Sequence, residues 1–219
     1  MISYEKIIAS DSIRTYITAA DASLEALGYT EHSFAHVLRV AKTAGDILEI
    51  MGYDEKTVEL AKIAGYLHDI GNLVNRKEHS QSGAVMAWSI LNDMGGDASE
   101  IATIVTAIGN HDEGTGVAVN DVAAAVILAD KADVRRSRVR NQDRSTFDIH
   151  DSVNYSVIDS VLEINEEHTH IKLKMTLDTE YGSVMDFFEI FMERMLMCKR
   201  AAKRLGLTFQ LLINGQQLG

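Results

Sequence analysis

Residues 64–71 read AGYLHDIG, and this stretch decides the fold because it closes an apolar helix with a histidine and an aspartate. The apolar residues before it recur at intervals of three and four, the spacing of a buried helical face. Gly71 gives the helix a place to end. We therefore expect His68 and Asp69 at the edge of a hydrophobic core, held as rigidly as a metal site requires.

The same helical spacing continues on both sides and covers the first two-thirds of the 219-residue chain. Proline is absent, so helices must end at glycine, at polar caps or through tertiary contacts. Asp54 and Asp97 are expected to cap helices. The predicted helices cover residues 3–9, 11–28, 33–51, 54–71, 80–94, 97–108 and 121–139.

The last third changes to the two-residue period of β-strands. Apolar and polar side chains alternate in residues 171–177, as in a strand with one buried face. Residues 157–164 and 207–213 are predicted as further strands, and residues 184–205 as a long helix with one apolar face. We therefore predict a mainly α protein, with a helical domain over residues 1–150 and a small β-β-α-β (α+β) appendage over residues 151–219.

The composition excludes some classes of function. With 21 basic and 32 acidic residues the net charge is −11, which disfavours binding to bulk nucleic acid. The longest apolar run, residues 122–129, is far too short to cross a bilayer, so no membrane partner is expected. The single cysteine, Cys198, suits a reducing compartment. The sequence predicts a cytoplasmic protein and leaves a homodimer open.

Further candidate metal ligands lie at the edges of other predicted helices. His36 is in the first turn of one helix, His79 opens another, and His111 follows a third. Asp130 lies within the apolar run ILADK, where a buried carboxylate needs a partner or a cation. Imidazole and carboxylate together suit zinc, iron or manganese. By contrast, the dipeptide at residues 150–151 lies in a polar stretch, and we expect it to be a solvated pair.

The order and spacing of His36, His68-Asp69 and Asp130 resemble the HD-domain superfamily of metal-dependent phosphohydrolases, an all-helical fold. The flanking sequences HVLRV, LHDIG and LADK resemble the family as well. His79 and His111 resemble the ligands of its dinuclear branch, which has six ligands. The resemblance covers residues 30–140 and leaves the appendage outside it.

Two departures from the family's patterns bear on the site. Asn72 stands three residues after Asp69, where many members have lysine. A proline-free chain also lacks the Gly-Tyr-Pro signature of one group of cyclic-dinucleotide enzymes, which counts against that substrate. His32, four residues before His36, is an alternative first ligand on the same helical face, but the residues after His36 match the family better.

The resemblance implies two divalent metal ions, with iron preferred and manganese, zinc or nickel as alternatives. One ion would take His36, His68, Asp69 and Asp130. The second would take His79, His111 and the other oxygen of Asp69, which makes Asp69 a bridge and the central catalytic residue. Two such ions can share a hydroxide, lower its pKa towards neutrality and clamp a phosphate oxygen.

A phosphate substrate also calls for positive charge near the metals. Lys131, Arg135 and Arg138 recur at helical spacing and are expected to form a basic stripe beside Asp130 that binds the substrate phosphate. Ordinary solvated surface is the competing interpretation of this stripe. On the phosphate-binding interpretation, replacing Arg138 with alanine should weaken substrate use and leave stability nearly unchanged.

The sequence thus favours a metal-dependent hydrolase of a phosphoester or phosphoanhydride bond, in a small molecule such as a nucleotide. Two alternatives remain open. A few members of the superfamily use the same six ligands in a di-iron oxygenase, and the ligands alone do not separate these activities. The second alternative is a catalytically silent ligand-binding or regulatory module. The presence of all six candidate ligands argues against it.

Overall fold

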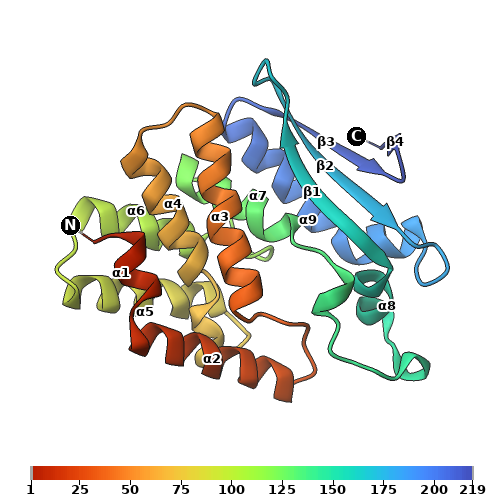
Figure 1. Ribbon diagram of the computed structural model, residues 1–219, viewed down its shortest axis with the longest axis horizontal. Helices are drawn as coiled ribbons and strands as arrows, with labels where there is room; N and C mark the ends of the chain where they lie inside the picture. Colours follow the sequence, from red (N-terminus) through yellow and green to blue (C-terminus); the bar gives the residue numbers. More distant parts are fainter. Residues whose placement is uncertain (1, 219) are drawn as a thin grey trace.

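The computed structural model describes residues 2–218 and shows a helical bundle beside a small α+β unit (Figure 1). The bundle closely follows the helical periodicity of the sequence, and apolar faces of its helices form a continuous core. Its helices are α1 (Tyr4–Ile8), α2 (Asp11–Ala26), α3 (Phe34–Ile50), α4 (Glu55–Leu67), α5 (His79–Asp93), α6 (Ala98–Gly109) and α7 (Asp121–Ala132).

Helix α7 is the centre of the molecule. The apolar run of residues 122–129 is buried on every side, because α7 packs against α3, α4, α6 and α9 (Val184–Arg204). A helix that is apolar all round is stable only where neighbours cover it completely. The polar residues that follow the run, Asp130 and Lys131, are consequently placed deep in the molecule, where their charges need partners.

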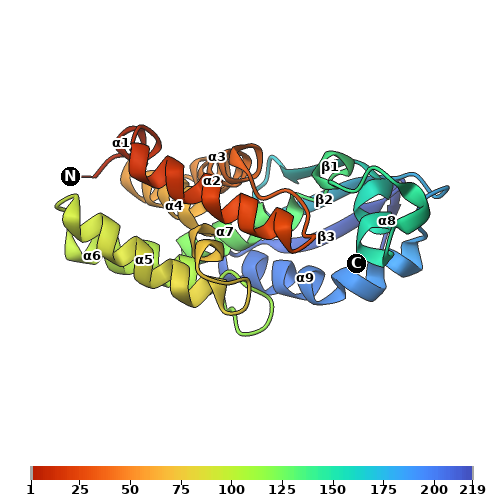
Figure 2. The same cartoon turned by 90° about the horizontal axis from the view of Figure 1, so that it is seen from below.

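The C-terminal unit has the predicted β-β-α-β order, followed by a short fourth strand that was not predicted. Strands β1 (Val157–Ile164), β2 (His170–Leu177), β3 (Thr208–Ile213) and β4 (Gln216–Gln217) form one sheet in that order, with β1–β2 antiparallel and β2–β3 parallel. Helix α9 connects β2 to β3 and covers one face of the sheet (Figure 2). Since α9 also packs on α7, the unit is joined to the helical bundle at its central helix.

Three expectations about the helices are wrong. The helix predicted for residues 54–71 ends at Leu67 and is followed by a short 3₁₀ turn. Helix α7 ends at Ala132 and does not reach residue 139, because the backbone leaves the helical conformation at Asp133 (φ −81°, ψ 65°) and Ser160 donates to the free carbonyl of Ala132 at 2.6 Å. The predicted stripe of Lys131, Arg135 and Arg138 on one helix therefore does not exist. The polar stretch before β1 also contains a helix, α8 (Ile149–Ser156), which Asp148 caps by accepting from a backbone N–H.

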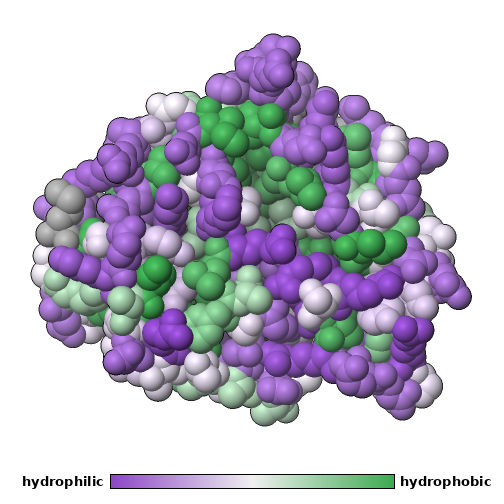
Figure 3. Space-filling model, viewed as in Figure 1, coloured by the Kyte–Doolittle hydropathy of each residue, from purple (hydrophilic) through white to green (hydrophobic). Residues whose placement is uncertain are grey.

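The surface is mostly hydrophilic on the face shown in Figure 3, with hydrophobic residues between the upper part of α3 and β1 and strongly hydrophilic residues below them. Within residues 2–218, no helix is both long enough and apolar enough to cross a membrane.

Candidate metal centre

The crossing of α3 and α4 places the first two histidines. A Cβ on Gly65 would lie 2.9 Å from the Cα of Ala41, so only glycine allows the two helices to approach this closely. His36 lies in the first turn of α3 and His68 follows the last residue of α4. Their Nε2 atoms are 3.2 Å apart, and both side chains are fully buried.

A second close approach places His79. A 3₁₀ turn, η1 (Ile70–Leu73), follows Asp69 and packs against the start of α5. A Cβ on Gly71 would lie 1.9 Å from the carbonyl oxygen of His79, which no side chain could tolerate. Glycine in the HDIG segment therefore lets the HD pair and the start of α5 share one space. His111, just after α6, reaches the same space, and its Nε2 lies 3.1 Å from that of His79.

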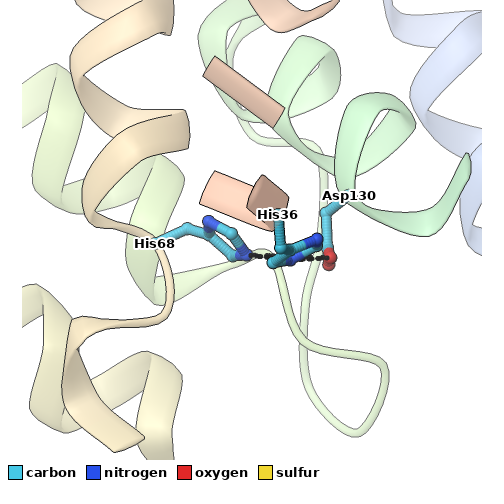
Figure 4. Close-up of side chains that lie close together, drawn as sticks. All are labelled: His36, His68 and Asp130. Carbon is cyan, nitrogen blue, oxygen red and sulfur yellow. Dashed lines mark hydrogen bonds and ion pairs between the residues drawn. The ribbon is translucent and has the colours of Figure 1, made fainter. Parts of the chain in front are cut away.

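The side chains of His36, His68 and Asp130 converge from three helix ends (Figure 4). Oδ1 of Asp130 is 3.4 Å from the Nε2 of His36 and 3.7 Å from that of His68. Oδ2 of Asp69 completes this group, at 3.5 Å and 3.2 Å from the same two nitrogens. Two imidazoles and two carboxylate oxygens thus surround one point.

The other oxygen of Asp69 faces the second pair of histidines. Oδ1 of Asp69 lies 3.3 Å from the Nε2 of His79 and 3.8 Å from the Nε2 of His111. Oδ1 of Asp112 is 4.0 Å from the Nε2 of His79 and is a further oxygen on this side. The two oxygens of one carboxylate therefore point at two different pairs of imidazoles, the arrangement that a bridging ligand requires.

The hydrogen bonds of the four histidines fix which ring nitrogen faces the cluster. Each Nδ1 contacts an oxygen that can only accept, so Nδ1 carries the proton and Nε2 offers a lone pair. Four lone pairs and two carboxylates then face one another with no hydrogen between them, which only a cation or added protons can stabilise. The acceptors are Asp133 Oδ2 for His36 (2.8 Å), Gly65 O for His68 (2.7 Å), Arg76 O for His79 (3.1 Å) and Ile108 O for His111 (2.7 Å).

The nitrogen separations fit metal coordination. Two ligand atoms bound at about 2.1 Å, with angles of about 90–109° between them, lie about 3.0–3.4 Å apart. The Nε2 atoms of His36 and His68, at 3.2 Å, and those of His79 and His111, at 3.1 Å, have this spacing. The donor set and its spacing therefore fit two divalent cations.

In the absence of a metal ion, the pKa values of the cluster also favour positive charge at this position. Burial opposes a charge on His68, but the carboxylates of Asp69 and Asp130 outweigh it and raise the pKa of His68 to about 10. Burial would also raise the pKa of Asp130, yet Lys131 and the two histidines hold that pKa well below its usual range. The pKa of Asp69 is lowered in the same way, chiefly by His68 against the effect of burial. The cluster keeps ionised carboxylates and attracts positive charge.

Asn72 and Asp133 hold two side chains of the cluster from behind. Asn72 donates to Oδ1 of Asp69 at 2.9 Å, so the residue that departs from the family pattern holds this carboxylate. Asp133, which the sequence analysis missed, accepts from His36 with one oxygen and from Arg135 Nε, at 3.0 Å, with the other. Such partners fix the ring orientation and basicity of a metal ligand.

A cavity of about 330 Å³ opens onto Asp69, His79, His111 and Asp130. Four cationic side chains line this cavity: Arg76, Lys131, Arg138 and Arg194. Lys131 and Arg138 are two of the three residues predicted to bind phosphate.

The structure does not bring Arg135 to this cavity. Its guanidinium is paired with Glu31 at 2.9 Å and with Asp133 at 3.0 Å, behind the cluster, because the chain is extended after α7. Arg138 is buried and donates to the backbone carbonyls of Glu31 and Asp133. The expectation that replacing Arg138 leaves stability nearly unchanged does not fit this buried, hydrogen-bonded position.

The cavity also contains residues that sequence reasoning did not assign. His150 and Asp151 line it from α8, so they do not belong to an unstructured loop, and His150 remains exposed. Arg194 and Phe191 line it from α9. His32, the alternative ligand, also lines it, but its Nδ1 contacts the carbonyl of Thr30 at 2.7 Å, and His36 is the histidine that lies in the cluster.

The chain is similar to a protein sequence, to a solved structure and to a family model. The chain is 28% identical over 204 residues to the uncharacterized protein MJ1020 of Methanocaldococcus jannaschii, covering 82% of this chain and 77% of the relative. A crystal structure at 1.45 Å of a predicted HD superfamily hydrolase from an uncultured Thermotogales bacterium has 24% sequence identity and a TM-score of 0.42. That similarity covers 60% of this chain and 73% of the other.

The family model described as HD domain matches residues 33–143, which are 111 of the 219 residues. The matched range contains all six side chains of the cluster. The family match is consistent with the order of these side chains and with the two glycines that let their helices meet. Because the match covers half of the sequence, the chain belongs to the HD domain family.

Proposed function

We propose that the protein is a metal-dependent phosphohydrolase that cleaves a phosphoester or phosphoanhydride bond in a small molecule, with a nucleotide as the favoured substrate. Family membership supports a metal-dependent hydrolase in general. The observation that carries the finer proposal is the cavity, which joins a cluster of metal-binding side chains to four cationic ones. Guanidinium and ammonium groups beside divalent cations are what a phosphate group requires.

The six side chains of the cluster would hold two metal ions. His36, His68 and Asp130 with Oδ2 of Asp69 would bind one ion, and His79 and His111 with Oδ1 of Asp69 the other. Mixed imidazole and carboxylate ligands suit iron, our first choice, and also manganese, zinc or nickel.

Bound metals would supply Lewis acidity and a water of lowered pKa, so the protein needs no serine or cysteine nucleophile. The chain's own residues then have to hold the ligands and receive the substrate. Asn72 and Asp133 hold Asp69 and His36. Lys131, which is paired with Asp130 at 2.7 Å, and Arg138 would add positive charge at the wall beside the carboxylates of Asp69 and Asp130.

The remaining walls of the cavity support a nucleotide. Tyr29 offers exposed aromatic surface for a base, and the carboxylates of Asp148 and Asp151 can accept from sugar hydroxyls. A cavity of about 330 Å³ is at the lower end of the range for small-molecule sites, so a mononucleotide fits better than a longer ligand.

Phosphate release from a nucleotide panel tests the proposal. Protein purified without chelator should contain metal and release phosphate from at least one nucleotide, and a chelator should abolish the release until metal is restored. The matched control is the Asp130→Asn variant, which should show no release. Metal-loaded protein that releases no phosphate but consumes oxygen with a reduced substrate would replace the proposal by the oxygenase alternative. If the loaded protein does neither, the silent binding module is favoured instead.

A further inference from the structure

Arg194 comes from a part of the chain that the family match does not include. It lies on α9, in the C-terminal unit, whereas the match ends at residue 143. Its side chain is 27% exposed and lines the cavity together with Phe191 from the same helix, and its guanidinium carbon lies 4.6 Å from the centre of the Phe191 ring. An element outside the matched domain thus contributes to the wall of the candidate site.

A line of alternating charges connects Arg194 to the cluster. Lys131 Nζ is 2.7 Å from Asp130 Oδ2 and 3.3 Å from Glu113 Oε1. The same Glu113 oxygen is 2.6 Å from Arg194 Nε. Burial would raise the pKa of Glu113, but Lys131 and Arg194 lower it to about 2, so the carboxylate is ionised. Three short contacts therefore fix Arg194 close to Asp130.

Glu113 is the carboxylate that both cations of this line contact. Glu113 has one negative charge for two cations, and Asp130 is already shared with two histidines. Glu113 Oε1 is buried and accepts no hydrogen bond of normal geometry from the described residues. Glu113 therefore holds Arg194 by charge through Nε, and among the described residues no hydrogen bond from Nη1 or Nη2 of Arg194 is present.

We propose that Arg194 binds an anionic oxygen of the substrate, so that the C-terminal unit supplies a specificity-determining residue of the same site. The inference rests on the proposed function for the identity of the substrate as a phosphate compound. Glu113 is then the counter-charge that Arg194 shares with Lys131, and it does not touch the substrate. Arginine suits this task, because its planar group can pair with Glu113 at Nε and with a phosphate at the two Nη atoms.

Binding of inorganic phosphate to the full-length, manganese-saturated protein tests this assignment by calorimetric titration. Arg194→Ala should weaken phosphate binding by about 10-fold or more, and 10-fold corresponds to about 1.4 kcal/mol. Arg200→Ala is the matched control, because Arg200 is an exposed arginine on the same helix, and it should bind phosphate as the wild type does. Metal content and melting temperature, measured on the same samples, show that each variant is folded and loaded.

Glu113→Gln separates a ligand-binding role from a structural one. Removing this carboxylate leaves Lys131 and Arg194 without their shared counter-charge, so phosphate should bind at least as tightly as to the wild type. If Arg194 only anchored Glu113, both variants would change phosphate affinity in the same direction, and that result overturns the assignment. An Arg194→Ala affinity within about twofold of wild type overturns it as well.

The two proposals can fail separately. Wild-type protein that binds phosphate through Arg194 but hydrolyses no phosphate compound keeps this inference and contradicts the proposed function. Hydrolysis with normal phosphate affinity in Arg194→Ala keeps the function and contradicts the inference. Wild-type protein that neither binds nor releases phosphate contradicts both.

Discussion

Replacing Asp69 with alanine should remove both metal ions from the protein and lower phosphate release by about 1,000-fold or more, equivalent to about 4 kcal/mol of lost transition-state stabilisation. The reason is geometric, because each oxygen of this carboxylate faces a different pair of histidines. Elemental analysis of the purified variant under metal-replete conditions measures the first effect, and a phosphate assay measures the second.

Two further variants make this result specific. His79→Ala should lose one ion and keep the other, because His79 approaches only one oxygen of Asp69. His150→Ala, which alters another His-Asp dipeptide, should keep both, since His150 is exposed and lies outside the cluster. Equal metal loss from the Asp69 and His79 variants would show that Asp69 is not the bridge.

Replacing Arg138 with alanine should destabilise the protein by about 3 kcal/mol, in contrast to the small effect that the sequence alone suggested. The guanidinium is 5% exposed and donates to the carbonyls of Glu31 and Asp133 at 2.8 Å and 2.7 Å. Its removal leaves both oxygens buried without these charged donors and takes a counter-charge from the Asp133 carboxylate, 3.9 Å away.

Thermal and denaturant unfolding of the Arg138 variant provide the measurement. Arg200→Ala is the control, because Arg200 is exposed, and it should change the free energy of unfolding by less than about 0.5 kcal/mol. An Arg138 variant as stable as this control would mean that the buried guanidinium contributes nothing to the fold.

Local sequence patterns were enough to predict the elements whose own residues determine them. Helix α3 shows its buried face at three- and four-residue intervals, and β2 alternates apolar and polar side chains, so both were predicted closely. The histidines and aspartates of the cluster could be proposed as a set because each stands at the edge of an element and matches a family pattern in order.

The residues that were missed depend on contacts between distant parts of the chain. At the end of α7 the carbonyl of Ala132 accepts from Ser160, 28 residues away, and no pattern near residue 132 predicts that bond. Asp133 was overlooked because its partner, His36, is 97 residues away. Arg194 is one of several basic residues on an amphipathic helix, and only the packing of α9 on α7 brings it to the cavity.

The central claim is that Asp69 joins two metal ions in one site, and a crystal structure of the metal-replete protein with anomalous scattering tests it most directly. We expect two peaks about 3.5–4 Å apart, one beside His36, His68 and Asp130 and the other beside His79 and His111, with one oxygen of Asp69 on each. A single peak, or two peaks of which only one is bound by Asp69, would contradict the account.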